Sequence, residues 1–183
     1  TQVSDDSTNS ILDFSVSGTP RGGRYVAVTE DGLYAYSDDG ENWLEGNLPF
    51  SSTFVRVIAA KNRFVALPTN DDKIAYSLDG QTWTQRSLPV SAVWKDITFG
   101  GALDSENSTN GRFVIVGEQT QSALYSLDGA SWSAATLPVG DDSSGDEWQA
   151  VAYGQGRFVA ITGSQYKDVA YSTDNGVTWS RYN

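Results

Sequence analysis

The stretch Tyr36-Ser37-Asp38-Asp39-Gly40-Glu41-Asn42-Trp43 decides how this chain folds, because the chain contains it four times. Close copies stand at residues 76–83, 125–132 and 171–179, and the last copy is one residue longer. The Trp residues that end the copies are 40, 49 and 47 residues apart. This period is typical of a four-stranded repeat unit rather than of a helical hairpin.

Each copy belongs to a larger unit. An apolar segment comes first, as in residues 54–57, and then a turn residue, an Arg and a run of aromatic and β-branched residues, as in 62–67. That second pattern predicts a turn that enters a strand. The repeated phrase supplies a third strand and a tight turn, and a fourth strand ends at Leu-Pro in three units. We therefore read strand A, turn, strand B, loop, strand C, tight turn, strand D, with almost no α-helix.

A four-stranded meander cannot bury both of its faces alone, so repeated meanders that pack face to face predict a β-propeller. We predict an all-β fold of four four-stranded antiparallel blades in a single domain over residues 11–183. The blades are expected at about 11–49, 50–89, 90–138 and 139–183, after a polar N-terminal arm at 1–10. We expect one ring closed by packing alone; a larger ring made by two chains is the alternative.

Composition excludes several classes of function. The formal net charge of −11 argues against nucleic acid and against anionic membrane surfaces, and no apolar run is long enough to span a bilayer. Cys, Met and His are absent, which removes thiol chemistry, disulfides and the commonest general base and metal ligand. A β protein rich in small polar residues and without sulfur suits an extracellular or virion surface.

The repeated phrase resembles the Asp-box, also called the bacterial neuraminidase repeat, whose pattern is Ser/Thr-x-Asp-x-Gly-x-Thr-Trp. Residues 172–179 match that pattern position for position, whereas the other three copies lack the residue between Asp and Gly. The resemblance places the boxes at the C–D turns, away from the usual ligand site. The matching residues are Ser37, Asp39, Gly40 and Trp43; Ser77, Asp79, Gly80 and Trp83; Ser126, Asp128, Gly129 and Trp132; and Ser172, Asp174, Gly176 and Trp179.

We predict a structural role for these residues, with calcium or glycan binding by the boxes as the alternative. The Asp carboxylate can accept hydrogen bonds from the backbone of its own turn, and the Ser hydroxyl ties the turn to the incoming strand. The Gly supplies a positive φ, and the Trp ring packs beneath the turn.

The same family includes sialidases, which use three Arg residues to clamp a carboxylate, a Tyr–Glu pair and an Asp acid/base. Here Arg24, Arg63, Arg112 and Arg157 occupy one equivalent position in every unit, which indicates a scaffold role beside an acidic or carbonyl group near the A–B turn. The Arg-Ile-Pro context of the sialidase motif is absent, and four units replace the expected six blades. We expect no enzyme and no catalytic residue. A glycoside hydrolase with a carboxylate pair such as Asp72 and Glu118 is the alternative.

The B–C and D–A loops share the other face, which commonly carries function in propellers because its loops vary while the strands hold them. Their amides, carboxylates and one Tyr suit polyol recognition by hydrogen bonding and stacking; the alternative is that they are solvated loops. The candidate ligand-binding residues are Asp71, Asp72, Lys73, Glu118, Gln119, Gln121, Tyr166, Lys167 and Asp168.

Three further features need an assignment. Trp94 and Trp148 open strand A in two units and could stack sugars, but an apolar residue at that place in every unit is more simply core. The acidic pairs at 71–72 and 141–142 lack the spacing of a calcium loop, so we predict no metal and no cofactor. The polar insertion at 100–110 is expected to form an exposed loop or a contact with a neighbouring chain.

These repeats also look like those in bacterial and bacteriophage surface proteins. From that resemblance we expect a non-enzymatic propeller on a virion or cell exterior, active in adhesion or decoration, with a surface glycan or receptor as its ligand. The alternative is a purely structural virion assembly protein that contacts neighbouring subunits. A homo-oligomer is an open expectation, and neither nucleic acid nor membrane is an expected partner.

Overall fold

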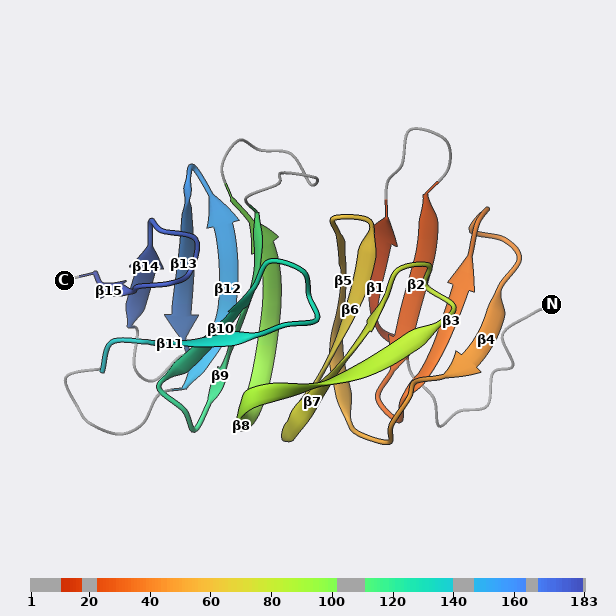
Figure 1. Cartoon of the computed structure of the whole chain (residues 1–183), viewed down its shortest axis with the longest axis horizontal. Helices are drawn as coiled ribbons and strands as arrows, with labels where there is room; N and C mark the ends of the chain where they lie inside the picture. The colour runs from red at the N-terminus through yellow and green to blue at the C-terminus, as the bar shows by residue number, and fades with distance from the viewer. Residues whose placement is uncertain (1–10, 18–22, 102–110, 140–146, 164–167, 183) are drawn as a thin grey trace.

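The computed structural model describes residues 11–17, 23–101, 111–139, 147–163 and 168–182. In this part of the chain every regular element is a β-strand, as the sequence predicts (Figure 1). No helix in the same residues is long and apolar enough to cross a membrane. The strands are β1 Ile11–Ser17, β2 Arg24–Thr29, β3 Leu33–Ser37, β4 Leu44–Asn47, β5 Phe54–Ala60, β6 Arg63–Pro68, β7 Asp71–Ser77, β8 Trp83–Gly100, β9 Arg112–Glu118, β10 Ser122–Ser126, β11 Ser133–Thr136, β12 Trp148–Gly154, β13 Arg157–Thr162, β14 Val169–Ser172 and β15 Ser180–Arg181.

The strands pair with their neighbours in chain order, and every pairing is antiparallel. β1–β4 form one sheet, β5–β11 form a seven-stranded sheet, and β12–β15 form a third sheet. We divide them by the sequence repeat into unit one (β1–β4), unit two (β5–β7 and the first part of β8), unit three (the second part of β8 with β9–β11) and unit four (β12–β15). The predicted meander of strands A to D is therefore confirmed in each unit.

One strand joins units two and three. β8 runs without a break through the predicted boundary at residues 89/90, so the expectation that Leu88-Pro89 ends a strand is wrong. Its ladder with β7 is irregular at this point, because Lys73 pairs with Ser87 while Asp71 pairs with Ala92. Pro89 lies in that irregular stretch, where the ladder needs no backbone donor.

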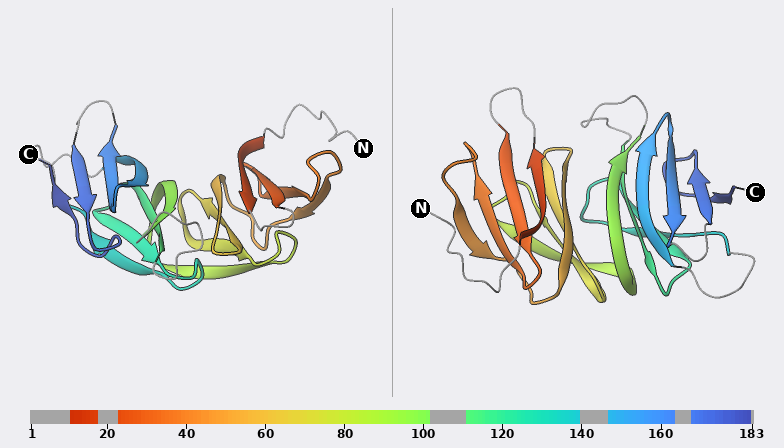
Figure 2. Two further views of the ribbon diagram at one scale, coloured as in Figure 1. Left: turned by 90° about the horizontal axis from the view of Figure 1, so that it is seen from above. Right: turned by 180° about the vertical axis from the view of Figure 1, so that it is seen from behind.

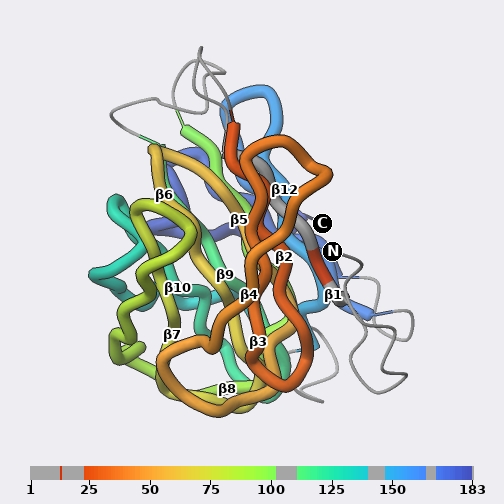
Figure 3. The backbone as a smooth tube through the Cα atoms, turned by 90° about the vertical axis from the view of Figure 1, so that its right-hand side faces the viewer, coloured from red at the N-terminus to blue at the C-terminus, as the bar shows by residue number. Residues whose placement is uncertain are grey.

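The units stand side by side along an arc (Figure 2), with β1, β5 and β12 toward its inner side. β1 and β2 pack against β5, β5 packs against β8, and β8 and β9 pack against β12. Units one and four lie at opposite ends of the arc, and Figure 3 looks onto the end that unit one occupies. The described residues therefore do not form the closed ring that we expected.

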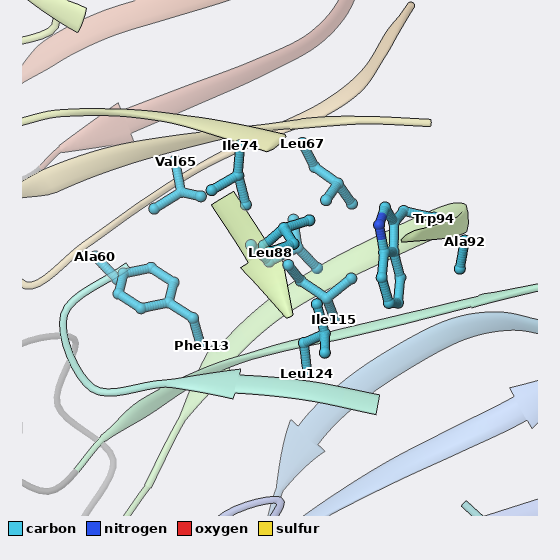
Figure 4. Close-up of a cluster of buried hydrophobic side chains, with 11 residues drawn as sticks. Ala60, Val65, Leu67, Ile74, Leu88, Ala92, Trp94, Phe113, Ile115 and Leu124 are labelled. Carbon is cyan, nitrogen blue, oxygen red and sulfur yellow. The ribbon is translucent and has the colours of Figure 1, made fainter. Parts of the chain in front are cut away.

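Three buried clusters fill the spaces between successive units. Figure 4 shows the cluster between units two and three, where Val65, Leu67 and Ile74 face Phe113 and Ile115. Trp94 and Trp148 are 0% and 1% exposed. Their prediction as core residues is confirmed, and their burial removes the alternative that they stack sugars.

Candidate functional site

The four repeated turns form the most regular polar structure in the chain. In unit two, Asp79 Oδ1 accepts hydrogen bonds from the backbone N–H groups of Gln81 (2.9 Å) and Thr82 (2.7 Å) and from the hydroxyl of Ser77 (2.9 Å). Ser77 Oγ in turn accepts from the N–H of Gly80, whose φ is 72°. The turns of units one and three repeat these bonds, and the longer turn of unit four keeps the Ser–Asp and Ser–Gly bonds.

These hydrogen bonds hold the four Asp carboxylates in the ionised form. Burial alone would raise the pKa of Asp79, but the N–H groups of Thr82 and Gln81 and the Ser77 hydroxyl outweigh it and lower that pKa to about 2. The pKa values of Asp39, Asp128 and Asp174 are lowered as well. The carboxylates are therefore used by their own turns, which supports the structural role that we predicted.

The Trp residue that ends each turn packs against it. Trp43, Trp132 and Trp179 donate their indole N–H to the carbonyl oxygen of the Gly in the same turn, at 3.1 to 3.2 Å. Trp83 differs, because its indole N–H is buried without a partner among the described residues.

The repeated Arg residues join one unit to the next. Arg24 Nη1 donates to the carbonyl oxygen of Asp79, and Arg63 Nη1 donates to that of Asp128, in each case across a unit boundary. The expected carbonyl partner is thus present for these two, and it belongs to the repeated turn of the following unit. Arg112, the counterpart in unit three, has its Nε and Nη1 atoms buried without a partner in the described chain and lies over the Tyr125 ring.

The candidate ligand residues of unit two open strand β7, directly after the β6–β7 turn, so the prediction that they belong to the B–C loop is wrong. Asp71 is part of the fold, because its carbonyl oxygen accepts the indole N–H of Trp94 at 3.1 Å and its carboxylate accepts the N–H of Lys73 at 3.2 Å. The Lys73 ammonium lies 5.7 Å from the centre of the Phe50 ring. Asp72 is exposed.

The candidate residues of unit three are divided between fold and solvent. Glu118 pairs with Lys95 (Nζ to Oε2, 2.9 Å) and accepts a hydrogen bond from the Gln149 side chain of unit four. Gln119 and Gln121 are exposed, and Gln119 has a positive φ of 58°.

In unit four, Asp168 forms an ion pair with Arg181, and its backbone N–H donates to Thr162 Oγ1 at 2.8 Å. Asp168 is therefore engaged within its own unit. Tyr166 and Lys167 lie outside the described residues, as do the arm at 1–10 and most of the insertion at 100–110.

The structure does not gather the candidate residues in one described cleft. A cavity of about 380 Å³ lies instead at the repeated turn of unit one. In the described chain, no group of three or more Asp and Glu residues is placed to hold a metal ion. Among the described residues, the loop face offers separate exposed groups, which can donate and accept hydrogen bonds. The cavity is lined by Tyr36, Ser37, Asp38, Asp39, Asn42, Trp43 and Leu44.

Sequence reasoning missed two kinds of polar link between units. Asp13 and Asp96 accept backbone N–H groups of the following unit, and Lys95, Glu118 and Gln149 form one cluster. A signal for the first link was present, because Asp13 and Asp96 both stand two residues after the residue that opens strand A.

The fold is similar to that of solved β-propeller proteins. Virginiamycin B lyase from Staphylococcus aureus, a catalytically inactive His-to-Ala variant with quinupristin, matches 98% of this chain and 57% of its own with a TM-score of 0.75 and 12% identity. YCF48 from Cyanidioschyzon merolae matches 95% of this chain and 56% of its own (TM-score 0.58, 16% identity). The computationally designed Ika4 protein matches 90% and 91% (TM-score 0.62, 13% identity).

These likenesses establish the class of fold: an all-β protein of the propeller kind. The chain spans little more than half the length of the first solved structures that it matches. No family model matches the sequence, and a search of curated proteins finds no match. The likeness to the Asp-box therefore rests on the repeated turns themselves.

Proposed function

We propose that this chain is a non-enzymatic β-propeller module of four Asp-box blades, displayed on a virion or outside a cell, which binds a surface glycan or receptor through its loop face. The observation that carries the proposal is the separation of the two edges of the sheets. At one edge the fold uses the Ser and Asp side chains of the repeated turns and the Arg24 side chain that bonds one of these turns. At the other edge, Asp72 at the start of β7 and Gln119 and Gln121 in the β9–β10 turn are exposed.

The chemistry of the loop face favours binding over catalysis. A retaining or inverting glycosidase needs two carboxyl groups in one cleft, roughly 5 to 10 Å apart. Of the pair considered from sequence, Glu118 is engaged by Lys95 and Gln149 while Asp72 is exposed. In the catalytically inactive lyase variant one histidine is replaced by alanine, and this chain has no histidine at all.

The test is a multivalent display of the protein on an array of glycans that includes bacterial surface polysaccharides. We expect selective binding that Asp72→Ala and Gln119→Ala reduce about tenfold, since each removes an exposed hydrogen-bonding group. Glu41→Ala is the matched control, because Glu41 is an exposed acid on the repeated turn of unit one. Absence of binding at high display density, or binding that all three variants retain, would contradict the proposal.

A second function is favoured by one observation. Ile161 on the outer face of unit four is 46% exposed. Ile161 and the half-buried Val159 lie on β13 at the end of the arc, where a structural virion protein would pack against another subunit. Failure of the glycan array together with stable association with another subunit would support this second function.

A further inference from the structure

The three boundaries between units repeat one packing contact. A Val of strand B in one unit lies against the Gly of the repeated turn in the next, so close that a Cβ built on that Gly would stand 2.6 to 2.8 Å from a Val methyl carbon. All of these Val and Gly residues are buried. The pairs are Val26 with Gly80, Val65 with Gly129, and Val114 with Gly176.

Unit four presents the strand-B side of this contact at the end of the arc. Val159 occupies the position of the three Val residues but is only half-buried. Ile161 is 46% exposed, whereas its counterparts Val28, Leu67 and Val116 are 0% exposed. Arg157 is exposed too, although its counterparts Arg24 and Arg63 bond the turn of a following unit. We call Arg157, Val159 and Ile161 the unit-four face.

Unit one presents the other side of the same contact. Gly40 is exposed, whereas Gly80, Gly129 and Gly176 are buried. A Cβ on Gly40 would approach no described residue of another unit, since its contacts within 4 Å are with the Tyr25 ring of its own unit. Ala35 is half-buried while its counterparts Ala75 and Ala170 are 0% exposed. We call Tyr25, Ala35 and Gly40 the unit-one face.

We propose that the unit-four face of one copy packs on the unit-one face of a second copy, and that two such contacts close a ring of two chains. Val159 then packs on Gly40 of the second copy, and Arg157 donates to the carbonyl oxygen of Asp39 in that copy. The contact is heterologous but closes by two-fold rotation about the centre of the ring.

Two observations favour a second copy as the occupant. The two end faces carry the same residue types that already pack on each other three times within the chain, so each end is complementary to the other. The chain also covers 57% of virginiamycin B lyase, so a propeller of that size needs further blades, and a second copy supplies blades.

The test is the mass of the protein in solution by light scattering and sedimentation over a wide concentration range. We expect a species of twice 19.8 kDa for the wild type. Ile161→Asp and Arg157→Glu should weaken the dimer at least a hundredfold, because each places a charge against an apolar or carbonyl surface. Both positions are exposed in the single chain, so both variants should fold, which circular dichroism verifies.

The matched control is Leu78→Asp. Leu78 is 64% exposed on the turn of unit two, and unit one already has an Asp at this place, Asp38. That variant should stay dimeric. The chain has no Cys, so a Gly40→Cys/Val159→Cys double variant should form disulfide-linked dimers on oxidation, while Val159→Cys alone should not. A monomer at every concentration, a dimer that survives Ile161→Asp and Arg157→Glu, or filaments that grow with concentration would overturn the proposal.

Discussion

Asp96 Oδ2 accepts a hydrogen bond of 2.9 Å from the backbone N–H of Val151, so unit three fixes the innermost strand of unit four. Asp13 makes the same 2.9 Å bond to Val57 between units one and two. Each Asp stands directly after a register shift between strands A and B, and such bulges turn a side chain away from its ladder. The inner side of the arc is therefore joined by charge-assisted hydrogen bonds as well as by apolar packing.

Replacing Asp96 by Ala should destabilise the chain by about 1 to 3 kcal/mol, because the Val151 N–H loses its acceptor in a partly buried place. The 3.3 Å pair with Arg56 is lost as well, although an exposed pair of this kind contributes little. Urea unfolding followed by Trp fluorescence measures the change. Asp72→Ala is the control, since Asp72 is exposed and should alter stability by no more than about 0.5 kcal/mol. Equal effects of the two substitutions would show that the inter-unit bond carries no stability.

Much of the fold was predictable because local signals agree with one another. The Asp-Gly turns, the β-branched runs after each Arg and the 40-to-49-residue spacing all indicate strands in meanders, and the structure has them. The continuity of β8 was not predictable from Pro89, because a proline ends a strand only where the ladder needs its missing N–H. Ring closure was not predictable either, since end units and inner units share one sequence pattern.

The candidate site was predicted less well than the fold. The exposure of Gln119 follows from its position in a B–C turn, whereas Asp72 belongs to strand β7. Glu118 and Asp168 are engaged by Lys95 and Arg181. Those partners come from other strands, and pairing across strands and units depends on register, which loop composition does not reveal.

The repeated turns should contribute measurable stability through their Asp residues. Asp128 Oδ1 accepts hydrogen bonds from the N–H groups of Ala130 (2.9 Å) and Ser131 (2.7 Å), so Asp128→Ala removes the acceptor of both donors at once. We expect a loss of about 1 to 3 kcal/mol, with a smaller loss for Asp128→Asn because the amide oxygen still accepts hydrogen bonds. Chemical denaturation measures both variants, with Glu41→Ala as an exposed acidic control. Equal stability of Asp128→Ala and the wild type would refute the structural role of the turn.

Stability should fall steeply in acid. The pKa of Asp79 is about 2 in the folded chain against an ordinary 3.8, so the folded state binds fewer protons than the unfolded chain in this interval. The contribution is fully present above pH 3.8 and is lost as pH falls through about 2. Asp39, Asp128 and Asp174 shift in the same direction and add to the effect. Urea midpoints measured across this range should decline in the wild type and decline less in Asp79→Asn; parallel curves would contradict the assignment.

The Val–Gly contact between units can be separated from backbone strain by comparing two glycines. Gly129 and Gly156 both have positive φ, 66° and 80°, so Ala at either position carries a similar backbone cost of about 1 kcal/mol. A Cβ at Gly129 would also lie 2.6 Å from a methyl carbon of Val65, whereas nothing lies within 4 Å of a Cβ at Gly156. Gly129→Ala should therefore cost about 1 to 3 kcal/mol more than Gly156→Ala.

Val65→Ala removes the methyl carbon that would overlap with that Cβ, so the double variant Val65→Ala/Gly129→Ala should be more stable than the sum of the two single changes predicts. The coupling measured in this double-mutant cycle is the packing part of the contact, free of the φ cost that Gly156→Ala reports. Strict additivity, or equal losses at Gly129 and Gly156, would mean that the units do not pack this closely and would weaken the basis for placing Val159 against Gly40 of a second copy.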